Sequence, residues 1–176
     1  MKKIFLLSFI FISNTHLFSQ TYVPVNDGSK VAFKIKNLGF NVDGSFSGLK
    51  GTIKFNPADL NASSFDITID ANSVNTDNDM RDNHLREGTY FDVKNHPVIH
   101  FVSEKIMASK TAFLIAGKLT IKNTTKDISF PFTAKDANGG FVFDGEFKIN
   151  RKDFEVGGGS TLSDNVTVNL HVVSKK

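Results

Sequence analysis

Hydrophobic and polar residues alternate along most of this chain with a period of two. In the segment SFDITIDA, Phe65, Ile67 and Ile69 occupy every second position, and Asp66 and Asp70 lie between or beside them. Successive side chains of a strand point to opposite faces of a sheet, so this alternation predicts a strand with one buried face. Eight segments carry the pattern: residues 29–37, 44–56, 64–71, 97–103, 112–121, 127–134, 141–150 and 165–172.

The connections between these segments favour an antiparallel arrangement. Most are short and contain Gly, Asn or Asp, as in DANGG at residues 136–140 and KNTTK at residues 122–126. Parallel strands need long crossovers, usually helical, and the chain has one long helical signal. Eight strands buried on one side can close into an all-β barrel without exposed edges, and a two-sheet sandwich is the alternative. A barrel of eight strands either is filled by its own side chains or holds one small ligand.

The helical signal lies in the charged stretch NTDNDMRDNHLREGTYFD, residues 75–92. Thr76 followed three residues later by Asp79 resembles a capping box, and Gly88 is a natural end for a helix. We expect one short helix of about three turns near residues 77–87.

The charges of this helix have two interpretations. Arg81, His84 and Leu85 share one of its faces, while Asp82 and Arg86 are spaced to pair at i and i+4 on another. A solvated helix that bridges two strands of the barrel needs no further role for them. In the alternative, Arg81, Asp82 and His84 form the catalytic cluster of an enzyme.

Metal and nucleophile patterns do not fit the chain. A calcium loop that begins at Asp77 would place Arg81 at a ligand position and Asp82 where glycine is required. His96 and His100 are about 13 Å apart along an extended strand, too far for both rings to bind one zinc ion with bonds of about 2 Å. The chain has no cysteine, and it has no nucleophile-elbow motif. We therefore expect no metal and no catalytic residue.

Arg151 is the one charged residue that continues an inward-facing series, since it follows Phe147 and Ile149 at the same parity. A charge that enters an apolar interior is costly unless it is paired or lies at the mouth. Two roles are open: an internal ion pair with Asp82 or Asp153, or recognition of an anionic head group.

The N-terminus predicts export. Lys2 and Lys3 precede the apolar run 4–12 and a short polar segment, which is the order of a cleaved signal peptide over residues 1–19. We expect residues 20–176 to form a single domain in the periplasm or outside the cell. Basic residues exceed acidic ones by three in the whole chain and by one without the two lysines, so charge does not predict a nucleic-acid partner.

Three long segments resemble the YceI-like family of periplasmic polyisoprenoid-binding proteins: NTDNDMRDNHLREGTYFDVKNHPVIHFVSEKI, GKLTIKNTTKDISFPF and FKINRKDFEVGGGSTLSDNVTVNLHV. The resemblance extends from Tyr22 onward. The matched motif positions are Thr76, Arg81, Asp82, His84, Leu85, Arg86, Tyr90, Phe91, Asp92, Pro97, Ile99, Phe101, Arg151, Asp153 and Phe154. Two positions depart from the family pattern: Glu155 stands where glycine is common, and Asn37 where histidine is often found.

The resemblance implies a lipocalin-like barrel whose apolar cavity holds an isoprenoid chain, a quinone or a fatty-acid-like molecule, without catalysis and without a cofactor besides this lipid. Together with strand parity it predicts an apolar cavity lined by Phe33, Ile35, Phe46, Phe91, Ile99, Phe101, Phe130, Phe132, Phe147 and Ile149. The polar mouth is predicted to contain Arg81, Asp82, His84 and Arg151. Transient membrane contact and a homodimer are open, and a ligand-free interaction barrel is the third function.

Overall fold

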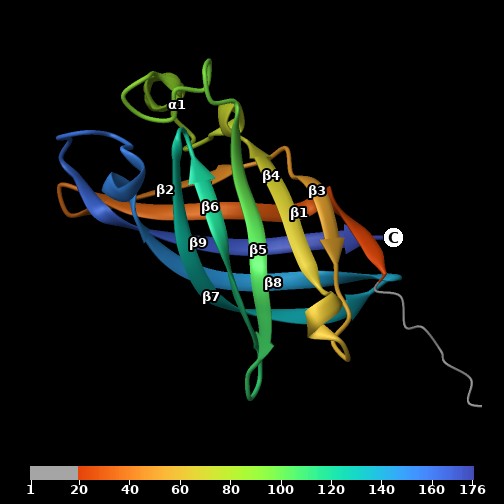
Figure 1. Cartoon of the computed structure of the whole chain (residues 1–176). Coiled ribbons are helices and arrows are strands. Elements are labelled where there is room, and N and C mark those ends of the chain that lie inside the picture. The colour runs from red at the N-terminus through yellow and green to blue at the C-terminus, as the bar shows by residue number, and fades with distance from the viewer. Residues whose placement is uncertain (1–19) are drawn as a thin grey trace, which may run out of the picture.

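The computed structural model describes residues 20–176, and the predicted signal peptide lies outside the described residues. The described chain is almost entirely strand, with one α-helix (Figure 1). The strands are β1 (Thr21–Asn37), β2 (Phe40–Phe46), β3 (Lys50–Lys54), β4 (Ser64–Asp70), β5 (Val98–Ala108), β6 (Phe113–Ile121), β7 (Thr124–Ala137), β8 (Gly140–Asn150) and β9 (Leu162–Lys175). The helices are α1 (Asp79–Arg86) and the 3₁₀ turns η1 (Leu60–Ala62), η2 (Ala71–Ser73) and η3 (Arg151–Phe154).

The strands form an eight-stranded antiparallel barrel. From β3 to β9 each strand pairs with the next, and β1 closes the ring by pairing with β9 from Val23–Lys175 to Asn37–Leu162. β2 and β3 share one place in the ring, because both pair with the other edge of β1. The prediction of one strand over residues 44–56 is thus corrected to two strands separated by the break at Ser47–Leu49, where Gly48 has a φ of 72°. The sandwich alternative is not adopted.

β1 is longer than the alternation predicted. It begins at Thr21 instead of residue 29, although Pro24 and the segment Asn26–Gly28 look like turn sequence. The pairing of β1 with β9 shifts register between Val25 and Lys30, and Gly28 has a φ of 79°. A bulge absorbs residues that would end an isolated strand, so the long strand continues through a turn-like sequence.

The 3₁₀ turn η1 and one group of interlocked rings close the barrel at one end. Phe55 follows β3 directly and is 2 % exposed. Its ring meets five phenylalanines nearly edge-on, with centroid separations of 5.1–6.2 Å: Phe65, Phe113, Phe132, Phe141 and Phe143. Edge-to-face packing is the favoured geometry of aromatic pairs, so this end of the interior is filled. We call it the closed end.

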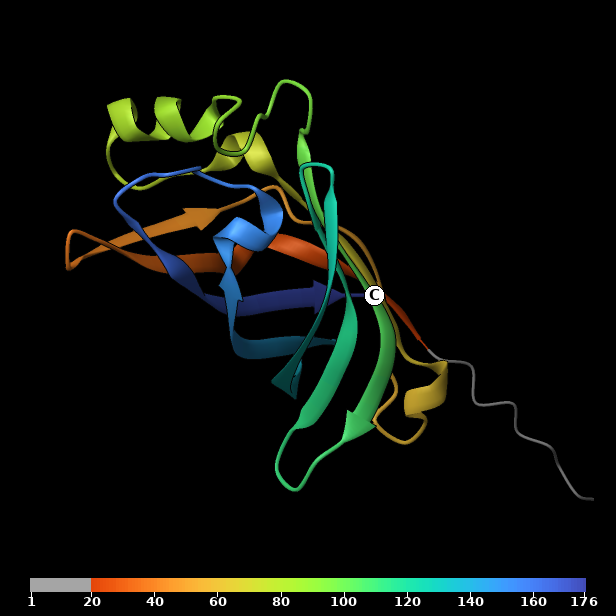
Figure 2. The ribbon, with the colours of Figure 1, turned by 60° about the vertical axis from the view of Figure 1, so that its left-hand side comes forward.

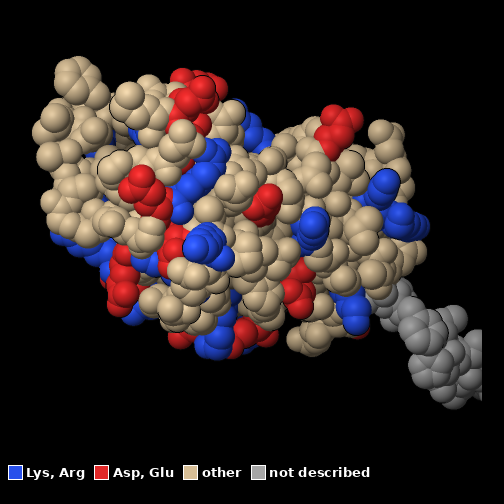
Figure 3. Space-filling view, turned by 90° about the horizontal axis from the view of Figure 1, so that it is seen from above, with Lys and Arg blue, Asp and Glu red and all other residues tan. Residues whose placement is uncertain are grey.

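The helix α1 lies at the opposite end of the barrel, above β2 and the loop between η3 and β9 (Figure 2). The segment between α1 and β5 and the loop between η3 and β9 cover the same end, which we call the α1 end. No helix within residues 20–176 is long and apolar enough to cross a membrane. Seen from above, charged side chains of both signs are interspersed over the α1 side of the molecule (Figure 3).

Candidate functional site: an apolar barrel cavity

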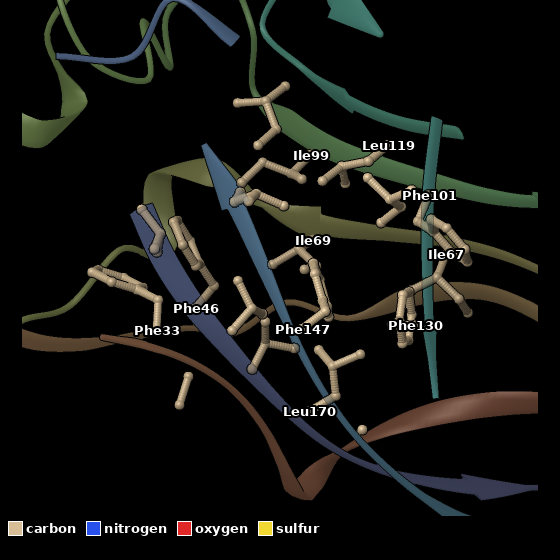
Figure 4. A pocket seen from close by; sticks show the side chains of 18 of the residues that line it. Phe33, Phe46, Ile67, Ile69, Ile99, Phe101, Leu119, Phe130, Phe147 and Leu170 are labelled. Carbon is tan, nitrogen blue, oxygen red and sulfur yellow. The ribbon is translucent and has the colours of Figure 1, made fainter. Parts of the chain in front are cut away.

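A cavity of about 220 Å³ lies inside the barrel between the closed end and the α1 end. Side chains from every strand position around the ring converge on it, and Figure 4 shows Phe33, Phe46, Ile99 and Phe147 directed toward a common space. Among the described residues that line it, Asp144 and Arg151 are the only charged ones. The carboxylate of Asp144 pairs with His171, 2.6 Å away, and both side chains are 40–48 % exposed. The cavity wall is therefore hydrocarbon and aromatic ring over nearly its whole extent.

All ten residues predicted for the apolar cavity lie along this wall: Phe33, Ile35, Phe46, Phe91, Ile99, Phe101, Phe130, Phe132, Phe147 and Ile149. Their contact with a ligand stays a prediction. The wall also includes apolar residues of the alternating segments that are not among the predicted cavity residues, such as Ile67, Ile69, Val168 and Leu170. Their parity was a sufficient signal, since each alternates with polar neighbours on its strand.

The four residues predicted for the polar mouth do not lie together. Arg151 lines the cavity, whereas Arg81, Asp82 and His84 do not appear along its wall. From α1 the wall receives Leu85 instead, and from the segment after α1 it receives Tyr90 and Phe91. The helix α1 thus contributes the apolar side chain of Leu85 to the cavity wall, and its charged side chains do not line the cavity.

Asp82 and Arg81 hold α1 to the preceding loop through Thr76. Asp82 and Thr76 are each 5 % exposed, and the Asp82 carboxylate accepts hydrogen bonds from the Thr76 N–H at 2.9 Å and from its hydroxyl. Arg81 donates to the Thr76 hydroxyl and carbonyl oxygens, both at 2.7 Å. These bonds explain how a charged segment can pack at the barrel end without unsatisfied buried groups.

Two details of the predicted helix are wrong. The N-cap is Asn78, whose side-chain oxygen accepts from the Arg81 N–H at 2.9 Å, because Thr76 is engaged by Asp82. The expected pair between Asp82 and Arg86 is not among the ion pairs of residues 20–176. Arg86 instead donates to the carbonyl oxygens of Asn72 and Val74, each at 2.9 Å, and so fastens the last turn of α1 to η2.

No side-chain hydrogen bond within residues 20–176 joins His84 to Arg81 or Asp82. The His84 ring packs edge-on against Tyr90 with the centroids 5.1 Å apart. The three members of the alternative catalytic cluster therefore do not converge on one point. Within the described residues there is no group of three or more His, Cys, Asp or Glu side chains placed to hold a metal ion.

Arg151 is buried, 3 % exposed, and its predicted carboxylate partners are wrong. Its Nε donates to Ser163 O at 3.0 Å, its Nη1 to Val156 O and Gly158 O at 2.7 and 3.2 Å, and its Nη2 to Leu162 O at 3.1 Å. The fifth acceptor is the carboxylate of Asp164 at 3.4 Å. A guanidinium has five N–H donors, so all of them have an acceptor. Arg151 ties the loop after η3 to the start of β9.

The two departures from the family pattern lie at the same end of the barrel. Glu155 has a φ of 56° and ψ of 34°, a left-handed conformation that glycine adopts without strain. This explains physically why glycine suits the position. The Asn37 side chain accepts a hydrogen bond from the Thr161 hydroxyl at 2.7 Å and thereby joins the end of β1 to the loop before β9.

Two residues outside the cavity wall have shifted pKa values. Burial, with a smaller contribution from the charge of Asp136, raises the pKa of the Tyr22 hydroxyl at the closed end. Hydrogen bonds to Asp127 and Glu104 raise the pKa of Lys118, which is exposed on the outer face. Neither group faces the cavity, so neither contributes charge to it.

Comparisons with known proteins give a family model, sequence relatives and solved structures of the same fold. The model of the YceI-like domain matches residues 22–174. A UPF0312 protein of Pectobacterium atrosepticum is 32 % identical over 133 residues, which are 72 % of this chain and 69 % of that protein. The crystal structure of BcnA from Burkholderia cenocepacia is 29 % identical and superimposes with a TM-score of 0.80 over 85 % of this chain and 98 % of that one. A polyisoprenoid binding domain from Saccharophagus degradans has the same fold, with a TM-score of 0.73 at 17 % identity over 88 % of this chain and 97 % of that one.

Proposed function

The chain belongs to the YceI-like family, and we propose that it is an exported carrier that holds a polyisoprenoid or similar long-chain lipid in its barrel cavity. The observation that carries this proposal is the apolar wall, which extends from Phe65 and Phe132 near the closed end to Leu85 and Phe91 at the α1 end. A polyisoprenoid binding domain with this fold supports the same class of ligand.

Apolar burial can supply the affinity. Transfer of hydrocarbon out of water stabilises a complex by about 25 cal/mol per Å². About 400 Å² of buried chain would then contribute about 10 kcal/mol before ordering costs, enough for micromolar binding. A chain of isoprene units presents this kind of surface and needs no polar partner from the wall.

The engagement of Arg151 supports a ligand whose buried part is uncharged. Its five N–H groups all have protein acceptors, so a head group would have to displace one of them. We therefore propose that Arg151 is a positioning residue for the loop at the α1 end, and that a polar head group remains at the mouth or in solvent. Export is supported by the basic and apolar order of residues 2–12.

The direct test is to purify the protein from its own host and to identify extracted lipid by mass spectrometry. In parallel, the fluorescent probe N-phenyl-1-naphthylamine is bound and then displaced with geranylgeraniol. We expect an isoprenoid-type lipid in the extract and displacement at micromolar concentration. A protein that yields no extracted lipid and binds no probe would contradict the proposal.

Two neighbouring residues of β9 provide a matched pair of variants. Val168 lines the cavity, and Thr167 points from the opposite face of the same strand. Val168→Phe should occupy part of the cavity and weaken probe binding at least tenfold, whereas Thr167→Phe should leave it unchanged. Equal effects of the two variants would place the probe outside the barrel.

A further inference from the structure

The tip of the hairpin between β1 and β2 exposes two large apolar side chains, and the start of α1 exposes a third. Leu38 is 73 % exposed, Phe40 is 78 % exposed and Met80 is 84 % exposed. The other exposed large hydrophobic residues of the described chain, Val23 and Val98, are 42 % and 47 % exposed. The hairpin tip and the N-terminal end of α1 lie on the same side of the molecule (Figure 2). We call Leu38, Phe40 and Met80 the apolar tip.

Leucine is an unfavourable residue at position 38 for two separate reasons. Leu38 and Gly39 form the two-residue turn between Asn37 and Phe40, and both have positive φ values, 49° and 87°. Turns of this kind favour Asn-Gly or Asp-Gly, because a branched side chain is strained in the left-handed region. In addition, the exposed Leu38 side chain gains none of the free energy that burial of an apolar side chain provides.

The same molecule contains the favoured version of this turn. The hairpin between β7 and β8 also turns in two residues, Asn138 and Gly139, with φ values of 47° and 82°. The backbone geometry is thus nearly equal in the two hairpins, while one holds an exposed leucine and the other an asparagine. The turn geometry does not require leucine at the first of these turns, and the exposed side chain is free to contact something outside the chain.

The apolar tip lies beside the cavity. Phe33 and Ile35 of β1 and Phe46 of β2 line the cavity wall, so the hairpin that carries Leu38 and Phe40 is an extension of that wall. The α1 helix that carries Met80 also supplies Leu85 to the wall. Viewed from above, the end of the molecule on the hairpin side shows mostly uncharged side chains (Figure 3).

We propose that the apolar tip docks into the interfacial region of a lipid bilayer. Three side chains cover a few hundred Å² at most, well below the roughly 800 Å² per partner of a stable protein interface, which disfavours a second copy of the chain. The hairpin stem carries Lys34, which pairs with Asp43 at 3.4 Å, and Lys36, which forms no ion pair within residues 20–176. The exposed Asp77 and Asp79 lie beside Met80. The charges around the apolar tip are therefore mixed, and Lys36 is the basic residue that can face a lipid head group. Basic residues beside exposed apolar ones are typical of contact with a membrane surface, especially an anionic one. This docking rests on the proposed carrier function, in which lipid would pass between the bilayer and the cavity without crossing water.

The test is vesicle co-sedimentation of protein purified from cells that express the full chain. Vesicles consist of phosphatidylcholine, with and without phosphatidylglycerol. We expect wild-type protein to bind both, because the apolar side chains make the contact, and the comparison of the two vesicles measures what Lys36 adds. Leu38→Asn, which copies the turn at Asn138, should weaken binding about tenfold, and the triple variant L38N/F40T/M80Q should lose it.

Val23→Thr is the matched control, because Val23 is an exposed apolar residue at the start of β1, far from the hairpin (Figure 1). It should bind vesicles as wild-type protein does. All variants should keep the melting temperature and the binding of N-phenyl-1-naphthylamine, and Leu38→Asn should melt no lower than wild type. This probe separates failure of the docking surface from failure of the cavity proposal.

Three outcomes would overturn the docking proposal. The first is that wild-type protein does not sediment with either vesicle. The second is that the triple variant binds as wild type does. The third is a wild-type dimer, seen by analytical ultracentrifugation, that the triple variant abolishes while vesicle binding persists, since the tip would then join two copies of the chain.

Discussion

The two ends of the barrel use the same residue type in opposite ways. At the closed end, five other phenylalanine rings surround Phe55 with centroids 5.1–6.2 Å away. At the α1 end, Phe33, Phe46 and Phe91 form a row with centroids 5.5 and 5.2 Å apart, and the row lines open space. The closed end therefore contributes packing to stability, and the α1 end presents an apolar surface without filling it.

The two ends are also held by different forces. The closed end is held by dispersion and by burial of apolar surface, and each aromatic ring contributes a large buried area. The α1 end is held by charged side chains that bind backbone carbonyls and one hydroxyl: Arg151 on the loop before β9, Arg86 on η2, and Arg81 on Thr76. Each such bond contributes about 1.5–3 kcal/mol. The α1 end also has a buried apolar cluster, which includes Phe154 and Val156. The difference teaches that a barrel can keep a cavity between two packed regions when polar bonds hold the covering segments at one of them.

Removal of the central ring should have the largest effect on stability. Phe55→Ala leaves a hole among five rings and should lower the free energy of unfolding by about 3–5 kcal/mol. Urea denaturation followed by circular dichroism measures the change. Phe40→Ala is the matched control at a ring that is 78 % exposed and should change stability by less than about 0.5 kcal/mol. Similar losses in both variants would mean that Phe55 is not the centre of the core.

Arg151→Met should have the next largest effect and should act on the α1 end. It removes all five donors from the loop before β9, so we expect a loss of about 3 kcal/mol and faster hydrogen exchange at residues 156–163. The ratio of affinities for geranylgeraniol and for its phosphate ester should stay the same, because Arg151 is proposed to position the loop. Lys152→Met is the control, since the Lys152 side chain is exposed and pairs with the same carboxylate, Asp164, at 3.0 Å. A selective loss of the phosphate ester with stability intact would assign Arg151 to a head group instead.

Asp82→Ala should loosen α1 without affecting the closed end. It strands the buried N–H and hydroxyl of Thr76, at a cost of about 2 kcal/mol. Hydrogen exchange should rise in residues 76–86 and remain unchanged at Phe55 and its neighbours. Asp79→Ala, in the exposed first turn of the same helix, should cost about 0.5 kcal/mol through the helix dipole. If exchange rose equally at both ends, the two would be one cooperative unit.

Glu155→Gly should have the smallest effect and the opposite sign. A residue other than glycine pays about 1 kcal/mol for the left-handed conformation at φ 56°, and glycine offsets part of this gain by its greater freedom in the unfolded chain. We expect a gain of up to about 1 kcal/mol in thermal unfolding. Asn138→Gly, at φ 47°, should gain less because asparagine tolerates this region. A destabilised Glu155→Gly variant would show that the glutamate side chain has a structural contact of its own.

Much of the fold could be predicted from the sequence, because the period-two alternation is a local signal. It located each strand of the ring and assigned Phe33, Ile99, Phe130 and Phe147 to the inner face, where they line the cavity. The helix was found for the same reason, although its N-cap was placed at Thr76 instead of Asn78. The break between β2 and β3 and the early start of β1 were missed, since bulges depend on pairing with distant strands.

The sequence by itself determined that this chain forms one-sided antiparallel strands with aromatic inner positions and a single charged helix, since each of these follows from neighbours along the chain. Only the tertiary structure decided which phenylalanines fill the interior and which leave it open. Phe55 and Phe33 have the same parity signal, and the difference arises from where the closed ring brings other rings against them. The acceptors of Arg151 were equally beyond prediction, because four of the five are backbone carbonyls, which every residue has. Which of them meets a buried guanidinium is set by the path of the folded loop.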